Sequence, residues 1–213
     1  MFEKFPSLTR FSHGWTITEK LDGTNAAINI VYAGEPAVHD YLAANPDAAV
    51  ASVNEFFVFT QSRTKLIWPG KSTDNAGFSR FVQENADEIV AKLGEGRHFG
   101  EWVGKGVQKR HYNMTNKQFA LFNVNRWEGA DLPELVTTVP SIVKNAYLDN
   151  PGEAAVEALN GLRLMGSHFG PRHSDGMGYN NPEGVVMYHG PSNTAFKKTF
   201  EYDEQGKWAE KAK

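Results

Sequence analysis

The order in which strand-like and helix-like segments follow one another sets the fold class of this chain. Residues 15–20 and 25–31 alternate apolar and polar side chains around Asp22-Gly23, which predicts two strands joined by a tight hairpin turn. Further strands are predicted at residues 55–61, 98–104, 119–127, 183–189 and 194–200, and helices within residues 40–49, 74–93, 131–139 and 153–162. Because paired strands are interrupted by helices without a regular β-α-β rhythm, we expect an α+β fold with mainly antiparallel sheets.

Two further segments complete the expected organisation. Residues 165–181 are rich in Gly, His, Ser and Asn, which predicts a loop, and the polar tail at residues 203–213 predicts a short helix. No linker divides the chain convincingly, so we expect a single domain over residues 1–213.

Composition excludes several kinds of chemistry. The chain has no Cys, which excludes disulfides, thiolate metal sites and a thiol nucleophile, and which fits a cytoplasmic protein. It has neither the long apolar stretch of a signal peptide nor a run of about 20 apolar residues that could span a bilayer. With a formal net charge of −3, any contact with nucleic acid must be local or aided by a divalent metal.

A short motif at Glu19-Lys20-Leu21-Asp22-Gly23-Thr24-Asn25 could carry covalent chemistry. A Lys at the end of an apolar strand is partly desolvated, as an amine nucleophile requires, and small turn residues let a nucleotide approach the backbone. An ordinary hairpin with a solvated Lys would give the same pattern, so the motif by itself leaves both readings open.

The rest of the chain adds an ordered set of pieces to this motif. KLDGTN resembles the adenylylation motif of the covalent nucleotidyltransferases, which are the DNA ligases, RNA ligases and mRNA capping enzymes. Further matches follow in the order of that superfamily at Ser62-Arg63, residues 99–102, 119–124, 183–186 and 196–199. Within it the chain is most similar to ATP-dependent RNA ligases of the RNA ligase 2 type, through KFPSL, EKLDGTN and FGEWVGKGVQK.

The resemblance implies a role for each matched residue. Lys20 would attack the α-phosphate of ATP, and Lys197 and Lys198 would supply positive charge there. Glu183 would bind the cofactor and hold Mg²⁺ or Mn²⁺. The resemblance also implies nucleotide binding by these residues: Glu19, Leu21, Asn25, Arg63, Glu101 and Phe122.

Individual assignments have structural alternatives. Arg63 suits phosphate or ribose recognition but would also fit a surface loop. Glu101 would accept a ribose hydroxyl, or pair with Lys105 or Arg97 instead. Phe122 would stack on adenine, although FALFNV would bury aromatic side chains in any case.

The last motif departs from the family pattern of Lys-x-Lys. This chain has Lys197-Lys198-Thr199, and strand alternation would put Lys197 and Thr199 on one face and Lys198 on the other. A bulge could bring Lys198 inward instead, so the identity of the second cation stays open.

Two further groups of basic and His residues have no role assigned by the resemblance. Lys105, Lys109, Arg110 and His111 form either a phosphate contact or a solvated loop. His168 and His173 lack a convincing metal-ligand pattern.

The implied fold is a nucleotidyltransferase core of two antiparallel sheets with flanking helices and a nucleotide cleft, lacking a C-terminal accessory domain. The implied partners are RNA ends, with DNA or hybrid nicks as alternatives, and the protein is expected to act as a monomer away from membranes. The alternatives are a minimal ATP-dependent DNA ligase, a GTP-using capping enzyme, and a catalytically silent nucleic-acid-binding module.

Overall fold

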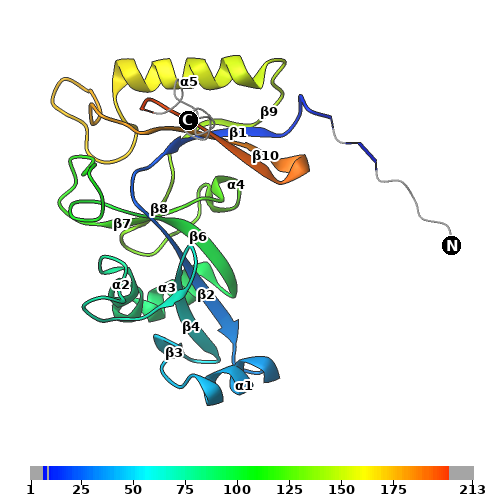
Figure 1. The fold of residues 1–213 in the computed structure, drawn as a ribbon, viewed down its shortest axis with the longest axis vertical. Coiled ribbons are helices and arrows are strands. Elements are labelled where there is room, and N and C mark those ends of the chain that lie inside the picture. The colour runs from blue at the N-terminus through cyan, green and yellow to red at the C-terminus, as the bar shows by residue number, and fades with distance from the viewer. Residues whose placement is uncertain (1–6, 9, 202–213) are drawn as a thin grey trace, which may run out of the picture. The chain divides into compact units, whose positions relative to one another are not determined.

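The computed structural model describes residues 7, 8 and 10–201 (Figure 1). The chain divides into two compact units, one formed by Met1–Leu21 with Pro140–Lys213 and the other by Asp22–Val139. The boundary therefore falls inside the KLDGTN motif. The predicted helix at residues 203–213 and most of the KFPSL segment lie outside the described residues.

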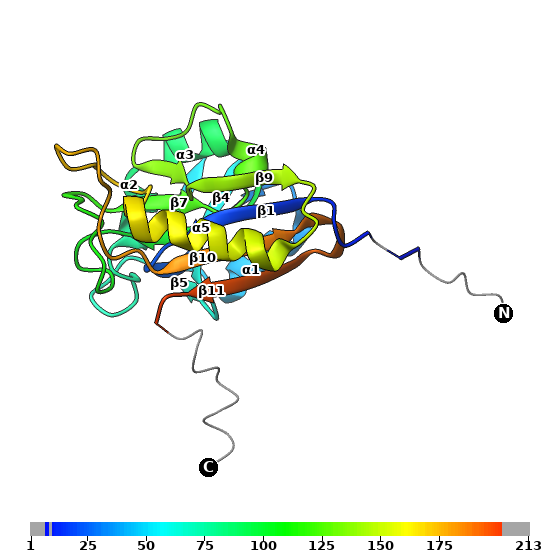
Figure 2. The same cartoon turned by 90° about the horizontal axis from the view of Figure 1, so that it is seen from above.

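The first unit is a four-stranded antiparallel sheet with one long helix on it. The strand order is β11-β10-β1-β9, with bounds β11 Thr194–Thr199, β10 Gly184–His189, β1 Trp15–Lys20 and β9 Ser141–Ala146. The short helix η1 (Gly190–Ser192) connects β10 to β11. Helix α5 (Pro151–Met165) lies over one face of the sheet, as Figure 2 shows. Its Ala155, Leu159 and Leu162 pack on Ile17 and Val185, so this face of the sheet is the core of the unit.

The second unit is built on a larger sheet. Its strand order is β3-β4-β2-β6-β7-β8, with bounds β3 Ala51–Val53, β4 Phe56–Ser62, β2 Thr24–Tyr32, β6 Gly96–Val103, β7 Gln118–Leu121 and β8 Val136–Thr138. Strand β5 (Leu66–Ile67) pairs with β4. The β7–β8 pair is parallel, and the other pairs in this sheet are antiparallel.

Four helices complete the second unit: α1 Pro36–Ala44, α2 Phe78–Glu84, α3 Ala86–Leu93 and α4 Val124–Trp127. Apolar side chains of α2 and α3, such as Phe78 and Ile89, join Ile28, Trp102 and Phe119 of the sheet in a continuous buried cluster. One face of this sheet is thus buried in the core of the second unit. The α+β class with two largely antiparallel sheets is confirmed.

The predicted hairpin at Asp22-Gly23 is wrong. Strand β1 pairs with β10 and β9, and β2 pairs with β4 and β6, so the two strands belong to different sheets. Alternation of apolar and polar residues reports that a segment is a strand with one buried face. It carries no information about which strand lies beside it, and here the Asp-Gly turn carries the chain from one sheet into the other.

Three other segment predictions need correction. The single helix at residues 74–93 is broken at Asn85, whose side chain donates to the carbonyl oxygen of Phe81 (2.7 Å) and thereby ends α2. The strand at 119–127 ends at Leu121, because Asn123 accepts a hydrogen bond from Arg126 N and starts α4. Residues 131–139 form no helix but contain β8, where β-branched residues favour the strand.

Several predictions hold within a few residues. The segments 55–61, 98–104, 153–162, 183–189 and 194–200 contain β4, β6, α5, β10 and β11, and residues 165–181 contain neither helix nor strand beyond the last residue of α5. Helix α1 starts before the predicted segment at 40–49, and β9 was not predicted. Among the described helices, none is long and apolar enough to cross a membrane.

Candidate active site

Lys20 ends strand β1 and is paired with Glu183. The pairing of Lys20 with Gly184 in the β1–β10 ladder brings Glu183, the residue before β10, to the same end of the sheet. Lys20 Nζ lies 2.7 Å from Glu183 Oε1, and the two side chains are 24% and 21% exposed. The Lys20 amine is thus held against a carboxylate, and an amine attacks as a nucleophile only through an unprotonated nitrogen.

The second carboxylate oxygen of Glu183 suits a divalent cation. Oε2 is buried and has no hydrogen-bond partner among the described residues. A buried carboxylate oxygen without a partner is costly, and Mg²⁺ or Mn²⁺ takes such oxygens together with waters and substrate phosphates. No cluster of three or more His, Asp or Glu side chains in the described part of the chain could hold a metal. Within the described residues, Glu183 thus offers a single carboxylate oxygen that could contribute to binding a cation.

Strand register decides which Lys of the last motif faces the same way as Lys20. Across the sheet, Lys20 is in line with Gly184 and Thr199, and the next row on that face, two residues along each strand, contains Lys197. Residues in line across a sheet, or two apart along a strand, point to one face. Lys20, Lys197 and Thr199 therefore share a face, as the alternation predicts.

Lys198 lies on the opposite face of the sheet. It is in line with Val185 and Glu19, on the side that α5 covers. The β10–β11 pairing is continuous from Gly184 to His189, so no bulge brings Lys198 over to the other face. Of the two candidate cations, Lys197 is the one whose strand position matches that of Lys20.

Gly184 is required by the close approach of β10 and β11. Its φ is +155°, and a Cβ atom there would lie 2.2 Å from the carbonyl oxygen of Lys198. No side chain can occupy that space without moving the backbone of β11. The Glu183-Gly184 pair thus combines a carboxylate with a residue that lets the last strand come close.

Glu19 is buried on the α5 face and is bonded within the protein. Its Oε1 accepts a hydrogen bond from Ser167 Oγ (2.5 Å) and its Oε2 accepts one from His168 N (2.8 Å). Burial raises the pKa of Glu19 to about 7, and the hydrogen bonds from Ser167 and the neighbouring backbone oppose this rise. Both carboxylate oxygens of Glu19 therefore bind the segment that follows α5. Nothing in the local sequence pointed to Ser167 as its partner.

In the second unit, predicted site residues gather on the sheet face that the main core does not use. Asn25 of β2 pairs with Glu101 of β6, so their side chains lie on one face. Phe122 continues β7 on that face, with its N–H donating to the carbonyl of Phe99 (3.0 Å). Phe122 is 40% exposed while Phe119 is wholly buried in the core. Of these two aromatic rings only Phe122 is exposed to solvent.

Two remaining candidates are placed by the same strands. Arg63 directly follows β4 and is exposed, next to Ser62, which pairs with Ala26. Leu21 is 3% exposed, so only its backbone can contact a nucleotide. Arg97, considered as a partner for Glu101, donates through Nε to Asn29 Oδ1 (2.8 Å).

The turn after Lys20 is held by the loop that follows β6. Tyr112 Oη accepts a hydrogen bond from the backbone N–H of Asp22 (2.7 Å), and Arg110 Nη1 lies 3.1 Å from Asp22 Oδ2. Arg110 is 6% exposed, so it belongs neither to a solvated loop nor to an open phosphate contact. Lys105 and Lys109 are exposed, as either alternative requires. Tyr112 lies outside every matched motif, and no local pattern in the sequence indicates its contact with Asp22.

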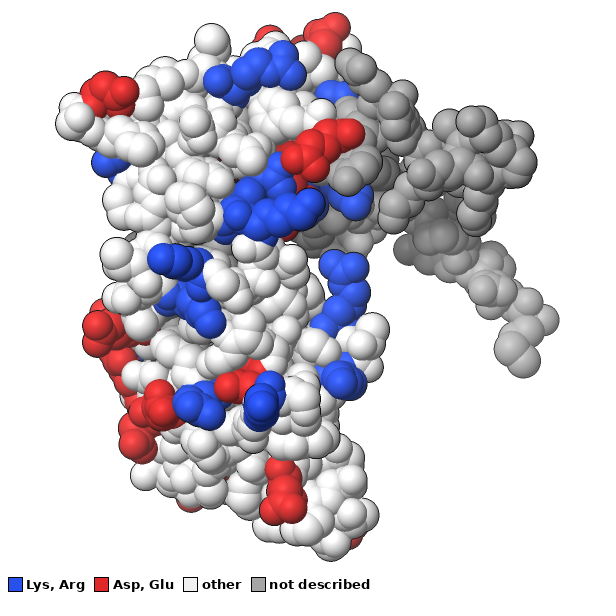
Figure 3. All heavy atoms as spheres, turned by 60° about the vertical axis from the view of Figure 1, so that its left-hand side comes forward, with Lys and Arg blue, Asp and Glu red and all other residues white. Residues whose placement is uncertain are grey.

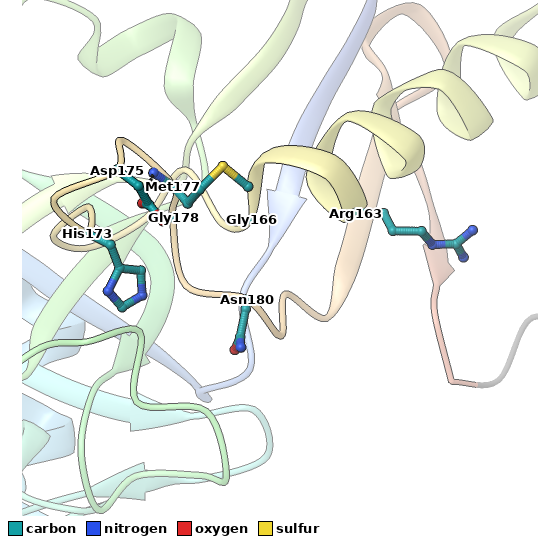
Figure 4. Close-up of a pocket in the computed structure, with 7 residues that line it drawn as sticks. All are labelled: Arg163, Gly166, His173, Asp175, Met177, Gly178 and Asn180. Carbon is teal, nitrogen blue, oxygen red and sulfur yellow. Dashed lines mark hydrogen bonds between the residues drawn. The ribbon is translucent and has the colours of Figure 1, made fainter.

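A separate hollow of about 390 Å³ lies beside the end of α5 (Figure 4). Its lining comes from α5 and the following loop: Arg163, Gly166, His173, Asp175, Met177, Gly178 and Asn180. The Arg163 side chain points away from His173 and Asn180 in this view. None of the predicted nucleotide-binding residues lines it.

Surface charge is unevenly distributed. Figure 3 shows Lys and Arg side chains in several groups on one face, although the chain as a whole carries a formal net charge of −3. Such local groups allow contacts with phosphates in a protein that is acidic overall.

Comparisons with known proteins agree with the fold. A family model described as RNA ligase matches residues 13–200. Solved structures of a Naegleria gruberi RNA ligase are similar to this chain. The structure with PPi has a TM-score of 0.52 at 13% identity, and covers 92% of this chain and 52% of the ligase. A mutant of that ligase with AMP and Mn has a TM-score of 0.53 at 14% identity; the match covers 91% of this chain and 52% of the ligase.

A further mutant of the Naegleria ligase, with ATP and Mn, gives a TM-score of 0.52 at 13% identity. At this identity the likeness shows a shared fold. This chain spans about half the length of the solved ligase. No curated protein matches the chain.

Proposed function

The chain belongs to the RNA ligase family, and from this we propose that it is an ATP-dependent RNA ligase that carries AMP on Lys20. The observation that supports this most directly is the Lys20–Glu183 pair at 2.7 Å, in which the other oxygen of Glu183 is buried without a partner. A nucleophilic amine next to a carboxylate with an unused oxygen is the arrangement that amine attack on a metal-bound phosphate needs.

The first step would be attack of Lys20 Nζ on the α-phosphorus of ATP. The N–P bond forms, the bond from the α-phosphorus to the bridging oxygen breaks, and pyrophosphate leaves. The Nζ atom gives up its protons to solvent. A divalent cation at Glu183 would neutralise phosphate charge when bound, and Lys197 on the same sheet face would add a positive charge for the developing phosphate oxygens.

Two further steps would complete sealing. A 5′-phosphate oxygen of a strand would attack the lysyl-bound AMP, which frees Lys20 and leaves AMP joined to that end through a pyrophosphate bond. A 3′-hydroxyl would then attack the same 5′-phosphate, forming the phosphodiester bond and releasing AMP. In the second step the leaving group is the Lys20 amine, which takes up a proton from solvent as the N–P bond breaks. In the third step the leaving group is AMP, whose phosphate charge Lys197 and a cation at Glu183 would stabilise.

Residues of the second unit would bind the nucleoside. Glu101 and Asn25 lie opposite each other in the β2–β6 ladder and present a carboxylate and an amide, which suit ribose hydroxyls. Phe122 is an exposed ring on the same face and suits stacking on adenine. Arg63 follows β4 beside this face and suits a phosphate or ribose. The solved Naegleria ligase with ATP and Mn, and with AMP and Mn, supports these ligand classes.

The experiment is to incubate the protein with labelled ATP and Mg²⁺ or Mn²⁺ and to look for an acid-labile adduct. We expect an adduct with the wild-type chain and none with Lys20→Ala. Lys92→Ala is the matched control, since Lys92 is a surface lysine on α3 beside Glu88 and Asp131. An adduct of equal yield in Lys20→Ala would contradict the proposal.

The same assay separates the other candidates. Labelling with GTP rather than ATP would identify a capping enzyme, and no covalent nucleotide with either would leave a nucleic-acid-binding module. We propose that residues 1–213 act as one catalytic domain, as a monomer, on RNA ends. Faster sealing of nicked DNA than of RNA or hybrid ends would reassign the substrate.

A further inference from the structure

The loop between β6 and β7 reaches the turn that follows Lys20. In residues 104–117, the side chains of Arg110, Tyr112 and Met114 are buried, at 6%, 0% and 6% exposed. Arg110 and Tyr112 both bond to Asp22. Fully buried polar side chains need partners, and Asp22 provides one for each of them. Two buried side chains of the loop therefore hold it against Asp22 of the nucleophile motif.

The backbone of this loop adopts an uncommon conformation at Tyr112 and Asn113. Tyr112 and Asn113 have φ values of +50° and +56°, in the left-handed region that side chains other than Gly adopt at a cost. The Asn113 N–H donates to Nδ1 of His111, which supports the tight turn. Local strain of this kind persists where the surroundings require one conformation. Here the conformation places the Tyr112 hydroxyl 2.7 Å from Asp22 N.

Arg110 supplies a buried positive charge opposite Asp22. The two side chains are 7% and 21% exposed and lie 3.1 Å apart. Asp22 follows Lys20 by two residues, so their Cα atoms are within about 7 Å of each other. An uncompensated carboxylate at that position would repel a triphosphate approaching Lys20 and would attract the ammonium form of the amine. Pairing with Arg110 removes this charge.

Resting on the function proposed above, we propose that Tyr112 and Arg110 are positioning residues for nucleotidyl transfer to Lys20. Tyr112 fixes the backbone of Asp22 and so the direction in which the chain leaves Lys20. Arg110 holds the Asp22 side chain and neutralises it. Neither residue needs to touch ATP, and both act through Asp22.

Tyr112→Phe is the decisive variant, because Phe keeps the buried ring and removes only the hydroxyl, which accepts the hydrogen bond from Asp22 N. We expect the Asp22 amide to lose protection from hydrogen exchange. We also expect lysyl–AMP formation at saturating ATP to slow about tenfold, with little change in the KM for ATP, since one buried hydrogen bond is lost without loss of a nucleotide contact. Tyr188→Phe is the matched control, because its hydroxyl donates to Asn193 Oδ1 (2.9 Å) in the turn after β10.

Arg110→Met and Arg110→Lys test the charge. We expect Arg110→Met to raise the KM for ATP about tenfold or more, because Asp22 is left unpaired. Arg110→Lys keeps the charge and is expected to recover part of the affinity for ATP. A merely structural role would instead change thermal stability without separating KM from the rate at saturation.

The outcomes separate this inference from the function on which it rests. If the wild-type chain forms no adduct with ATP, the proposed function fails. If the wild-type adduct forms, and Tyr112→Phe and both Arg110 variants label with wild-type rate and KM while Asp22 keeps its exchange protection, the positioning roles are wrong.

Discussion

Replacing Glu19 by Gln should change how the stability of this protein depends on pH. Glu19 is 1% exposed, and burial raises its pKa from 4.5 to about 7. One pKa unit corresponds to about 1.4 kcal/mol, so the free energy at stake is roughly 3 kcal/mol. Gln has a similar shape and can still accept from His168 N through its oxygen and donate to Ser167 Oγ through its amide nitrogen.

The sign follows from which state holds the proton. Below pH 4.5, Glu19 is protonated in the folded and the unfolded chain. As the pH rises from 4.5 to 7, the unfolded chain ionises first while the folded chain keeps its proton, so folding stability falls. Above pH 7 both states are ionised and the loss is complete. Gln does not titrate, so the variant lacks this pH dependence. The unfolding free energy of Glu19→Gln relative to the wild type should therefore rise by about 3 kcal/mol across this window.

Urea unfolding at several pH values from 4.5 to 8 measures this difference. His168, whose pKa is lowered mainly by burial, is present in both proteins, so its contribution largely cancels. Glu88→Gln is the control, because Glu88 is on the surface with Lys92 and its pKa is lowered rather than raised. Unfolding free energies of Glu19→Gln and the wild type that run parallel over this range would refute the assignment of a buried, protonatable Glu19.

Three further predictions concern the candidate site. Phe119→Ala should lower the unfolding free energy by about 3–5 kcal/mol, because the ring is wholly buried. Phe122→Ala should leave the unfolding free energy nearly unchanged and should raise the KM for ATP, as measured by labelling kinetics. Lys197→Met should slow lysyl–AMP formation at least tenfold more than Lys198→Met, since only Lys197 shares a sheet face with the nucleophile; equal effects would contradict the register. Gly23→Ala should destabilise the second unit by about 1–3 kcal/mol, because its Cβ would lie 2.4 Å from a carbonyl oxygen of β6; wild-type urea midpoints would argue against this close contact.

Local patterns were enough to find many of the elements. Alternation predicted β1 and β2, and the 3.6-residue spacing predicted helix over residues 74–93, which contain α2 and α3, because each pattern depends on residues close in sequence. The same spacing ran through residues 74–93 without revealing the break at Asn85. That break depends on one side chain bonding to the carbonyl of Phe81, which competes with helix continuation.

The sequence by itself determined the family through an ordered set of motifs, the nucleophile candidate Lys20, and the alternation that separates Lys197 from Lys198. Only the tertiary structure decided that β1 and β2 enter different sheets, that Ser167 holds Glu19, and that Tyr112 holds Asp22. Those partners lie 148 and 90 residues apart along the chain. A local pattern reports which side of an element is buried, whereas the choice of partner depends on how distant segments pack, and that information is not present in any short stretch of sequence.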